Sequence, residues 1–135
     1  MSTTTSIVTG MDFVSVPATD LDAARAFYAD VLGLECSSVW QRQGHDAMGA
    51  EFETGQMTIA VIATDKLGIP FSANCVPIAL HVDDVAAARA ELQSRGVEFG
   101  GDTIDSGVCH MAHFHDPDGN VLMLHHRYAP HADRG

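Results

Sequence analysis

Basic residues and cysteines are scarce in this chain of 135 residues. Lysine and arginine total 7 against 18 aspartates and glutamates, which leaves a formal net charge of −11. That charge repels nucleic-acid phosphates and anionic lipid headgroups, so we expect neither nucleic acid nor a membrane as a partner. The three cysteines, Cys36, Cys75 and Cys109, fit no zinc-knuckle or CxxC spacing and no disulfide framework. We therefore expect reduced and mostly buried thiols.

Long apolar runs are also absent. No run reaches the length of about 20 residues that crosses a bilayer, and the N-terminal MSTTTSIVTG lacks the basic region and hydrophobic stretch of a signal peptide. The chain is therefore expected to be cytoplasmic. Its length suits one domain that can bury a core without disulfides or metal staples.

What the sequence does contain is an internal repeat. The segment TDLDAARAFYADVLGL (19–34) matches DDVAAARAELQSRGV (83–97) at an offset of 64 residues. Each copy predicts an amphipathic helix with an aspartate as N-cap, Asp20 or Asp84, and a glycine after its end. The expected buried stripe of the first helix is Leu21, Ala24, Phe27 or Tyr28, Val31 and Leu32.

Segments of alternating apolar and polar residues flank both helices and predict strands. They span residues 13–17, 37–42, 47–53 and 56–63 around the first helix, and 77–82, 97–100, 108–115 and 120–127 around the second. The fold class is therefore α+β, with two tandem βαβββ modules whose curved sheets form a cup. The expected divisions are a lead-in (1–10), a single domain (11–127) with module one (11–63), linker (64–75) and module two (76–127), and a C-terminal tail (128–135).

The segment DPDGN (116–120) predicts a tight hairpin between the last two strands. Pro117 presets one turn position, Gly119 supplies a positive φ, and Asp116 can accept hydrogen bonds from the backbone that follows it. We expect its carboxylates to serve the turn rather than a calcium ion, because no EF-type loop is present.

Three segments resemble the vicinal oxygen chelate superfamily, which includes glyoxalase I, extradiol dioxygenases and bleomycin-sequestering proteins. They are DLDAARAFYADVLGL (20–34), VDDVAAARAELQSRGV (82–97) and FHDPDGNVLML (114–124), and with the duplicated plan they cover about residues 11–127. The resemblance implies a cup-shaped mixed sheet, a homodimer, and a divalent metal at the floor of the cup held by His, Glu or Gln. A shared fold does not fix the chemistry, since this fold serves several reactions.

The ligand positions that the resemblance implies do not hold metal ligands in this sequence. The family spacing places them at Phe13, Pro77 and Met123, and the fourth should come from MTIAVIA (57–63), which contains no His, Asp, Glu or Gln. Phenylalanine, proline and methionine do not suit a hard or borderline divalent ion. We therefore expect no metal at the usual place and no cofactor.

Strand alternation then predicts the side chains that line the cup. They are Phe13, Ser15, Trp40, Pro77, Ala79, His81, Met111, His113, Met123 and His125. A mainly apolar wall with a few polar anchors suits a small aromatic or amphipathic ligand. The alternative is that Phe13, Met111 and Met123 fill the cup and close it.

Two functions remain open. The first is a metal-independent binding protein that sequesters a small molecule, as in resistance proteins of this family. The second is a glyoxalase-like lyase, isomerase or dioxygenase-type enzyme that uses His113 or His125 as a catalytic acid or base. A variant of the second has zinc or iron held at a displaced site by His81, His113 and His125.

Overall fold

The computed structural model describes residues 5–131, so the outer ends of the predicted lead-in (1–4) and tail (132–135) lie outside the described residues. The first module contains β1 (Phe13–Ala18), α1 (Leu21–Ala26) with a π-helical continuation η1 (Phe27–Val31), β2 (Glu35–Trp40), β3 (Gly49–Glu53) and β4 (Thr58–Ala63). A short 3₁₀ helix, η2 (Thr64–Leu67), opens the linker. The second module contains β5 (Ile78–His81), α2 (Val85–Ser94), β6 (Ile104–Asp105), β7 (Cys109–His115) and β8 (Val121–Arg127).

Each module forms its own four-stranded mixed sheet, as the repeat predicts. The strand orders are β1-β4-β3-β2 and β5-β8-β7-β6. In each sheet the first strand runs parallel to the last one, while the other neighbours are antiparallel. The predicted α+β class with two βαβββ modules is confirmed.

The strand predicted at residues 97–100 is wrong. Only Phe99 forms a bridge there, to Phe114, and the edge strand of the sheet is β6 at residues 104–105. Gly101, with φ of 78°, turns the chain away, and Arg89 of α2 binds its carbonyl oxygen at 2.7 Å. The alternation at 97–100 therefore reflects Val97 and Phe99 packing against the core rather than a strand.

Both helices begin and end as the sequence predicts. The carboxylate of Asp20 accepts a hydrogen bond from the Ala23 amide at 3.1 Å, and Asp84 caps α2 in the same way at 3.0 Å. In the buried stripe of the first helix it is Tyr28 that is fully buried, while Phe27 is half-buried. Tyr28 follows Leu21 by seven residues and Ala24 by four, so regular helical spacing places it on the buried face, whereas Phe27 lies to the side of that face.

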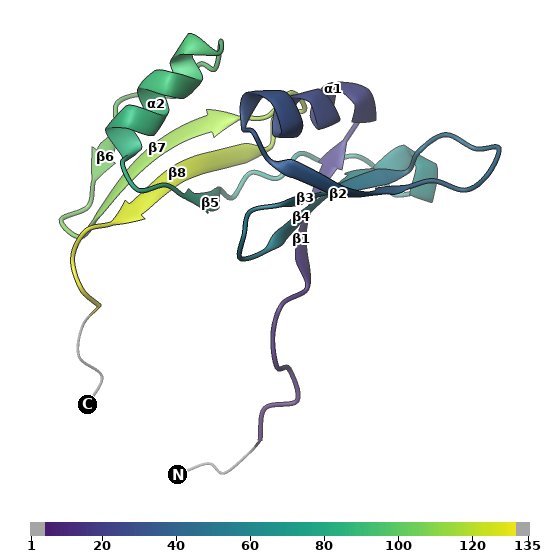
Figure 1. The fold of residues 1–135 in the computed structure, drawn as a ribbon, viewed down its shortest axis with the longest axis horizontal. Coiled ribbons are helices and arrows are strands. Elements are labelled where there is room, and N and C mark those ends of the chain that lie inside the picture. The colour runs from purple at the N-terminus through teal and green to yellow at the C-terminus, as the bar shows by residue number, and fades with distance from the viewer. Residues whose placement is uncertain (1–4, 132–135) are drawn as a thin grey trace.

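The helices α1 and α2 both lie on one side of the two sheets, and neither lies on the opposite side (Figure 1). Side chains that point toward the helices form the core, which includes Val16, Ala18, Phe52, Ile59, Val61, Phe114, Leu122 and Leu124. The alternate side chains of the same strands point to the uncovered side. We call these two uncovered surfaces the open faces of module one and module two.

The DPDGN hairpin joins the two modules as well as turning the chain. Asp116 accepts from the backbone amides of Asp118 and Asn120 at 2.9 Å, which confirms the predicted turn chemistry. The same carboxylate accepts from the hydroxyl of Tyr28 in module one at 2.8 Å, and the Asn120 side chain donates to the Pro17 carbonyl at 2.8 Å. These contacts connect residues 88 and 103 positions apart.

All three cysteines are free, but only Cys109 is buried. Cys36 and Cys75 are exposed, so the prediction of mostly buried thiols is wrong for two of three. Cys36 lies on the edge strand β2 and Cys75 in the linker, where no second layer covers them. Among residues 5–131, no helix has the length and hydrophobicity needed to span a bilayer.

Candidate functional site

The open face of module one is concave and aromatic. Phe13 and Ser15 of β1 point to it, because Val14 and Val16 between and beyond them pack toward the core. The rings of Phe13 and Trp40 lie 6.3 Å apart in an edge-to-face arrangement. Their strands, β1 and β2, are the two opposite edges of the sheet, so this contact requires the sheet to curve around the open face.

Two residues of β3 hold Trp40 over this face. A Cβ atom at Gly49 would lie only 2.8 Å from the indole Cε3 and 2.9 Å from the carbonyl oxygen of Val61, so only glycine leaves room for the ring. The indole Nε1 donates to Oε2 of Glu51 at 2.7 Å. Sequence reasoning missed Glu51, although its place between the apolar residues Ala50 and Phe52 in an alternating segment was a signal that it points to the open face.

The open face of module two carries the predicted histidines and methionines in two neighbouring rows. His81, His125 and Met111 are paired across β5, β8 and β7, and the next row is Ala79, Met123 and His113. Met111, His113, Met123 and His125 are half-buried, whereas Ala79 and His81 are exposed. The structure therefore brings six of the predicted site residues onto one surface, and Pro77 directly precedes the first strand of this sheet.

The histidines of this face do not converge on one point. His81 forms a 3.3 Å contact with Asp83, and its ring lies 5.9 Å from that of His126. Within the described part of the chain, no group of three His, Cys, Asp or Glu is placed to hold a metal ion.

The positions that the family resemblance implies as ligands do not fit a divalent ion either. Phe13 and Met123 point to the open faces with a ring and a thioether, and β4 presents Ala60 opposite Ser15. These groups lack the oxygen or imidazole donors that such ions require.

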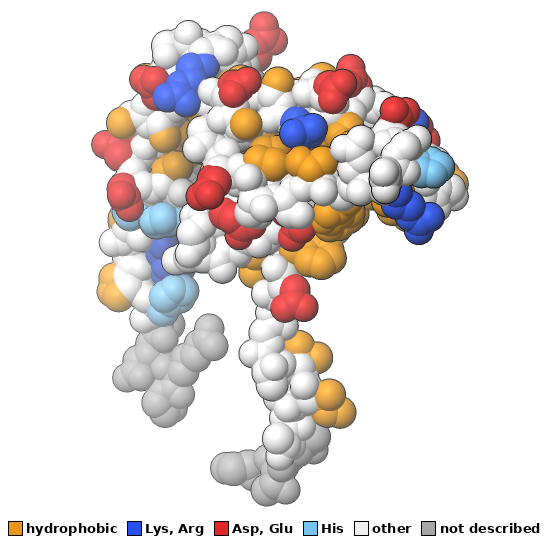
Figure 2. All heavy atoms as spheres, turned by 45° about the vertical axis from the view of Figure 1, so that its right-hand side comes forward, with side chains coloured by type: hydrophobic (Ala, Val, Ile, Leu, Met, Phe, Trp, Pro, Cys, Tyr) orange, Lys and Arg blue, Asp and Glu red, His pale blue; other side chains and the backbone are white. Residues whose placement is uncertain are grey.

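Residues 5–131 of one chain do not enclose the two open faces in one cavity. The extensive contacts between strands all lie within one module, and the modules meet through η1 and the DPDGN hairpin. In the space-filling view, hydrophobic side chains gather on the underside where the N-terminal segment leaves the body (Figure 2). The predicted lining residues therefore lie on open surfaces. Residues 5–131 of one chain supply no second wall that would complete a cup.

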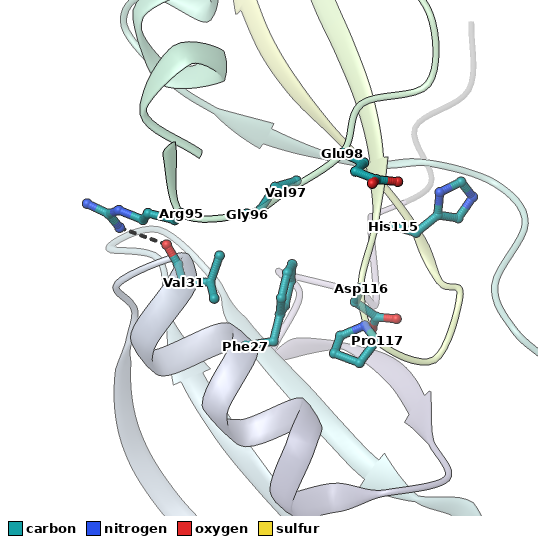
Figure 3. A pocket seen from close by; sticks show the side chains of 9 residues that line it. All are labelled: Phe27, Val31, Arg95, Gly96, Val97, Glu98, His115, Asp116 and Pro117. Atoms are coloured by element: carbon teal, nitrogen blue, oxygen red, sulfur yellow. Dashed lines mark hydrogen bonds between the residues drawn. The ribbon is translucent and has the colours of Figure 1, made fainter. Parts of the chain in front are cut away.

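A pocket that is open to solvent lies instead on the helix side, between η1 and module two (Figure 3). It has a volume of about 390 Å³ and is lined by Phe27, Val31, Arg95, Gly96, Val97, Glu98, His115, Asp116 and Pro117. Arg95 spans it by donating to the Val31 carbonyl at 2.7 Å. The buried Asp116 carboxylate already accepts hydrogen bonds from the turn amides and from the Tyr28 hydroxyl. We therefore interpret this pocket as the junction between the two modules.

Comparison with known proteins places the chain in a family. Residues 10–124 match the model of the Glyoxalase/Bleomycin resistance protein/Dioxygenase superfamily. The chain is 29% identical over 118 residues to YaeR, an uncharacterized protein of Escherichia coli K12, with 83% of this chain and 92% of that protein covered.

Among solved structures, TnmS3, an antibiotic binding protein from Streptomyces sp. CB03234, is 27% identical with a TM-score of 0.72 over 89% of this chain and 97% of that one. A lactoylglutathione lyase from Agrobacterium tumefaciens shares the fold alone, at 20% identity and a TM-score of 0.69 over 89% and 95% of the two chains. The matched residues include both repeated helices and the DPDGN hairpin, and with the two βαβββ sheets they show that this chain belongs to the Glyoxalase/Bleomycin resistance protein/Dioxygenase superfamily.

Proposed function

We propose that this protein binds a small aromatic or amphipathic molecule without a metal ion and sequesters it against its open faces. The observation that carries the proposal is the chemistry of those faces. Phe13 and Trp40 form a concave aromatic surface on module one, and Met111 and Met123 give module two an adaptable apolar surface. Histidine anchors beside the methionines supply the few polar contacts that fix a ligand's orientation.

We also propose that a second copy of the chain completes the cup. In one chain Phe13 is 46% exposed and Ile104, which pairs with Met111 on the open face of module two, is 48% exposed. Covering such side chains is favourable by about 25 cal/mol per Å² of apolar surface. A dimer that brings module one of one chain against module two of another would bury both and enclose the ligand. Light scattering after gel filtration is expected to give twice the chain mass.

The proposal is tested with Trp40, the single tryptophan of the chain, as reporter. The protein is titrated with the neutral aromatic probe N-phenyl-1-naphthylamine and with bleomycin while Trp40 emission is followed, and calorimetry gives the stoichiometry. We expect saturable binding that EDTA leaves unchanged. Phe13→Ala and Met123→Ala should weaken it about tenfold, since a truncated aromatic or thioether contact costs on the order of 1–2 kcal/mol.

The matched control is Leu67→Ala, because Leu67 is as exposed as Phe13 at 46% but lies on η2, away from the open faces. Its affinity should equal that of the unmodified protein. Binding that EDTA abolishes, or that responds equally to Leu67→Ala and Phe13→Ala, would contradict the proposal.

A second candidate function is catalysis by the histidines of module two. His113 pairs directly with Met123 across β7 and β8, and His125 lies two residues further along the same face. Both imidazoles are therefore placed to move a proton at a ligand lying over Met123. Turnover of a carbonyl substrate that His113→Ala abolishes while the circular dichroism spectrum persists would favour this candidate. Zinc or iron in the purified protein, lost on mutation of His81, His113 or His125, would favour its metal-dependent form.

A further inference from the structure

We infer that Glu51 is a specificity residue that selects ligands carrying a protonated amine next to a planar aromatic group. The inference rests on the proposed binding function and adds the charge of the ligand to it. It is carried by the position of one carboxylate beside the aromatic surface of module one.

Glu51 is fixed in place on the open face. It is half-buried on β3, its chain neighbours Ala50 and Phe52 are fully buried in the core, and its Oε2 holds the indole N–H of Trp40 at 2.7 Å. Within residues 5–131, no hydrogen bond or ion pair engages its second oxygen, Oε1. A ligand on the face of Trp40 thus meets a positioned carboxylate oxygen with capacity to accept.

The sheet that carries Glu51 supplies no cation to compete for it, and Arg42, His45 and Lys66 lie outside its strands, around Met48. The strands β1 to β4 carry three glutamates and no lysine, arginine or histidine. Glu53, two residues along the same strand, is already engaged at both oxygens, since Ser37 and Thr58 each donate to it at 2.6 Å. These hydroxyls lower the pKa of Glu53, so that carboxylate is satisfied within the sheet.

The Trp40 ring and the Glu51 carboxylate together favour a ligand with a positive charge next to a flat ring. A cation over the face of an indole is attracted by the ring, and the same cation gains a charge-assisted hydrogen bond from a neighbouring carboxylate. An anionic ligand would instead meet Glu51 at close range, and the net charge of −11 would repel it at longer range. A flat ring with a short amine arm can stack against Trp40 and Phe13 while the ammonium group reaches Oε1.

Three probes of equal shape test the inference: 2-naphthylmethylamine, 2-naphthalenemethanol and 2-naphthoic acid, which are cationic, neutral and anionic at pH 7. Their dissociation constants are measured by calorimetry for the full chain and for Glu51→Gln and Glu53→Gln. Glutamine at position 51 keeps an acceptor for the Trp40 N–H, so the aromatic surface is retained, and thermal unfolding confirms that both variants fold.

We expect the unmodified protein to prefer the amine over the alcohol by about tenfold to 100-fold, as the loss of a charge-assisted contact implies. Glu51→Gln should abolish that preference without weakening the alcohol, and Glu53→Gln should keep it. Equal binding of all three probes, or a preference that survives Glu51→Gln, overturns the role of Glu51 and leaves the proposed function standing. Failure of all three probes to bind overturns the proposed function itself and this inference with it.

Discussion

Removing the hydroxyl of Tyr28 should destabilise the protein by loosening the seam between its modules. The side chain is fully buried and donates to Oδ2 of Asp116, itself 5% exposed, at 2.8 Å. A hydrogen bond to a charged acceptor contributes about 1.5–3 kcal/mol. Because the Asn120 side chain donates to the same oxygen at 2.8 Å, Tyr28→Phe does not leave that oxygen without a partner. We therefore expect a loss near the lower end, about 1.5–2 kcal/mol in the free energy of unfolding.

Urea unfolding and thermal melts measure this loss, which corresponds to a fall in Tm of about 5–10 °C for a domain of this size. The matched control is Tyr128→Phe, the only other tyrosine in the chain, whose hydroxyl also donates to an aspartate, Asp105, at 2.7 Å. That pair is exposed, so its removal should change stability by less than about 0.5 kcal/mol. Equal losses in the two variants would refute the role assigned to the buried inter-module contact.

The same tyrosine makes a prediction about alkaline pH. Burial raises the pKa of Tyr28 strongly, and the neighbouring Asp116 carboxylate raises it further. In the unfolded chain the phenol ionises near pH 10, whereas the folded protein keeps it protonated. The stabilisation is therefore complete below pH 10 and is lost as pH rises above it. Unfolding free energies measured from pH 8 to 11 should fall more steeply in the unmodified protein than in Tyr28→Phe, and parallel curves would contradict this.

Three further substitutions probe other parts of the structure. Gly49→Ala should cost about 1–3 kcal/mol and shift Trp40 emission, because the added methyl group meets the indole at 2.8 Å and the Val61 carbonyl at 2.9 Å; unchanged emission would show that the ring has room. Asp84→Ala removes the N-cap of α2 and should cost about 1 kcal/mol by urea unfolding, while the same change at the exposed neighbouring Asp83 should cost less than about 0.5 kcal/mol. Asn120→Ala should cost about 3 kcal/mol or more in the free energy of unfolding, because its fully buried side chain forms hydrogen bonds with Pro17 in module one, Asp116 in module two and Asn74 in the linker. A near-neutral result by urea unfolding would refute its bridging role.

The parts of the fold that were predicted correctly are those set by local pattern. Asp20 and Asp84 act as N-caps as expected, and Gly33 and Gly96 adopt the positive φ that ends each helix. Strand alternation also placed Phe13 and Met123 on the uncovered side of the sheets. The edge strand was misplaced at 97–100 because Phe99 packs on Phe114 through a single bridge, and alternation alone does not distinguish such packing from a strand.

The face of the sheet on which the candidate residues lie was predicted from the sequence, whereas their side-chain contacts were not. The register confirms that Met111, His113, Met123 and His125 share one surface, as the period of two required. The sequence did not predict that the His81 ring would lie 5.9 Å from the His126 ring and that His81 would contact Asp83. Nor was it visible that Glu51 would support Trp40, because that contact depends on the register between β2 and β3, which pairs Trp40 with Gly49.

The sequence by itself determined the two βαβββ units, the ends of their helices and the side of each sheet to which a residue points. These features depend on interactions within a few residues and on the alternation of side chains along a strand. Only the tertiary structure decided how the units meet: Tyr28 reaches Asp116 across 88 positions, and Asn120 reaches Pro17 across 103. The relative position of the two sheets follows from which buried polar groups can satisfy one another and from the core that both modules share, and no local pattern encodes that pairing.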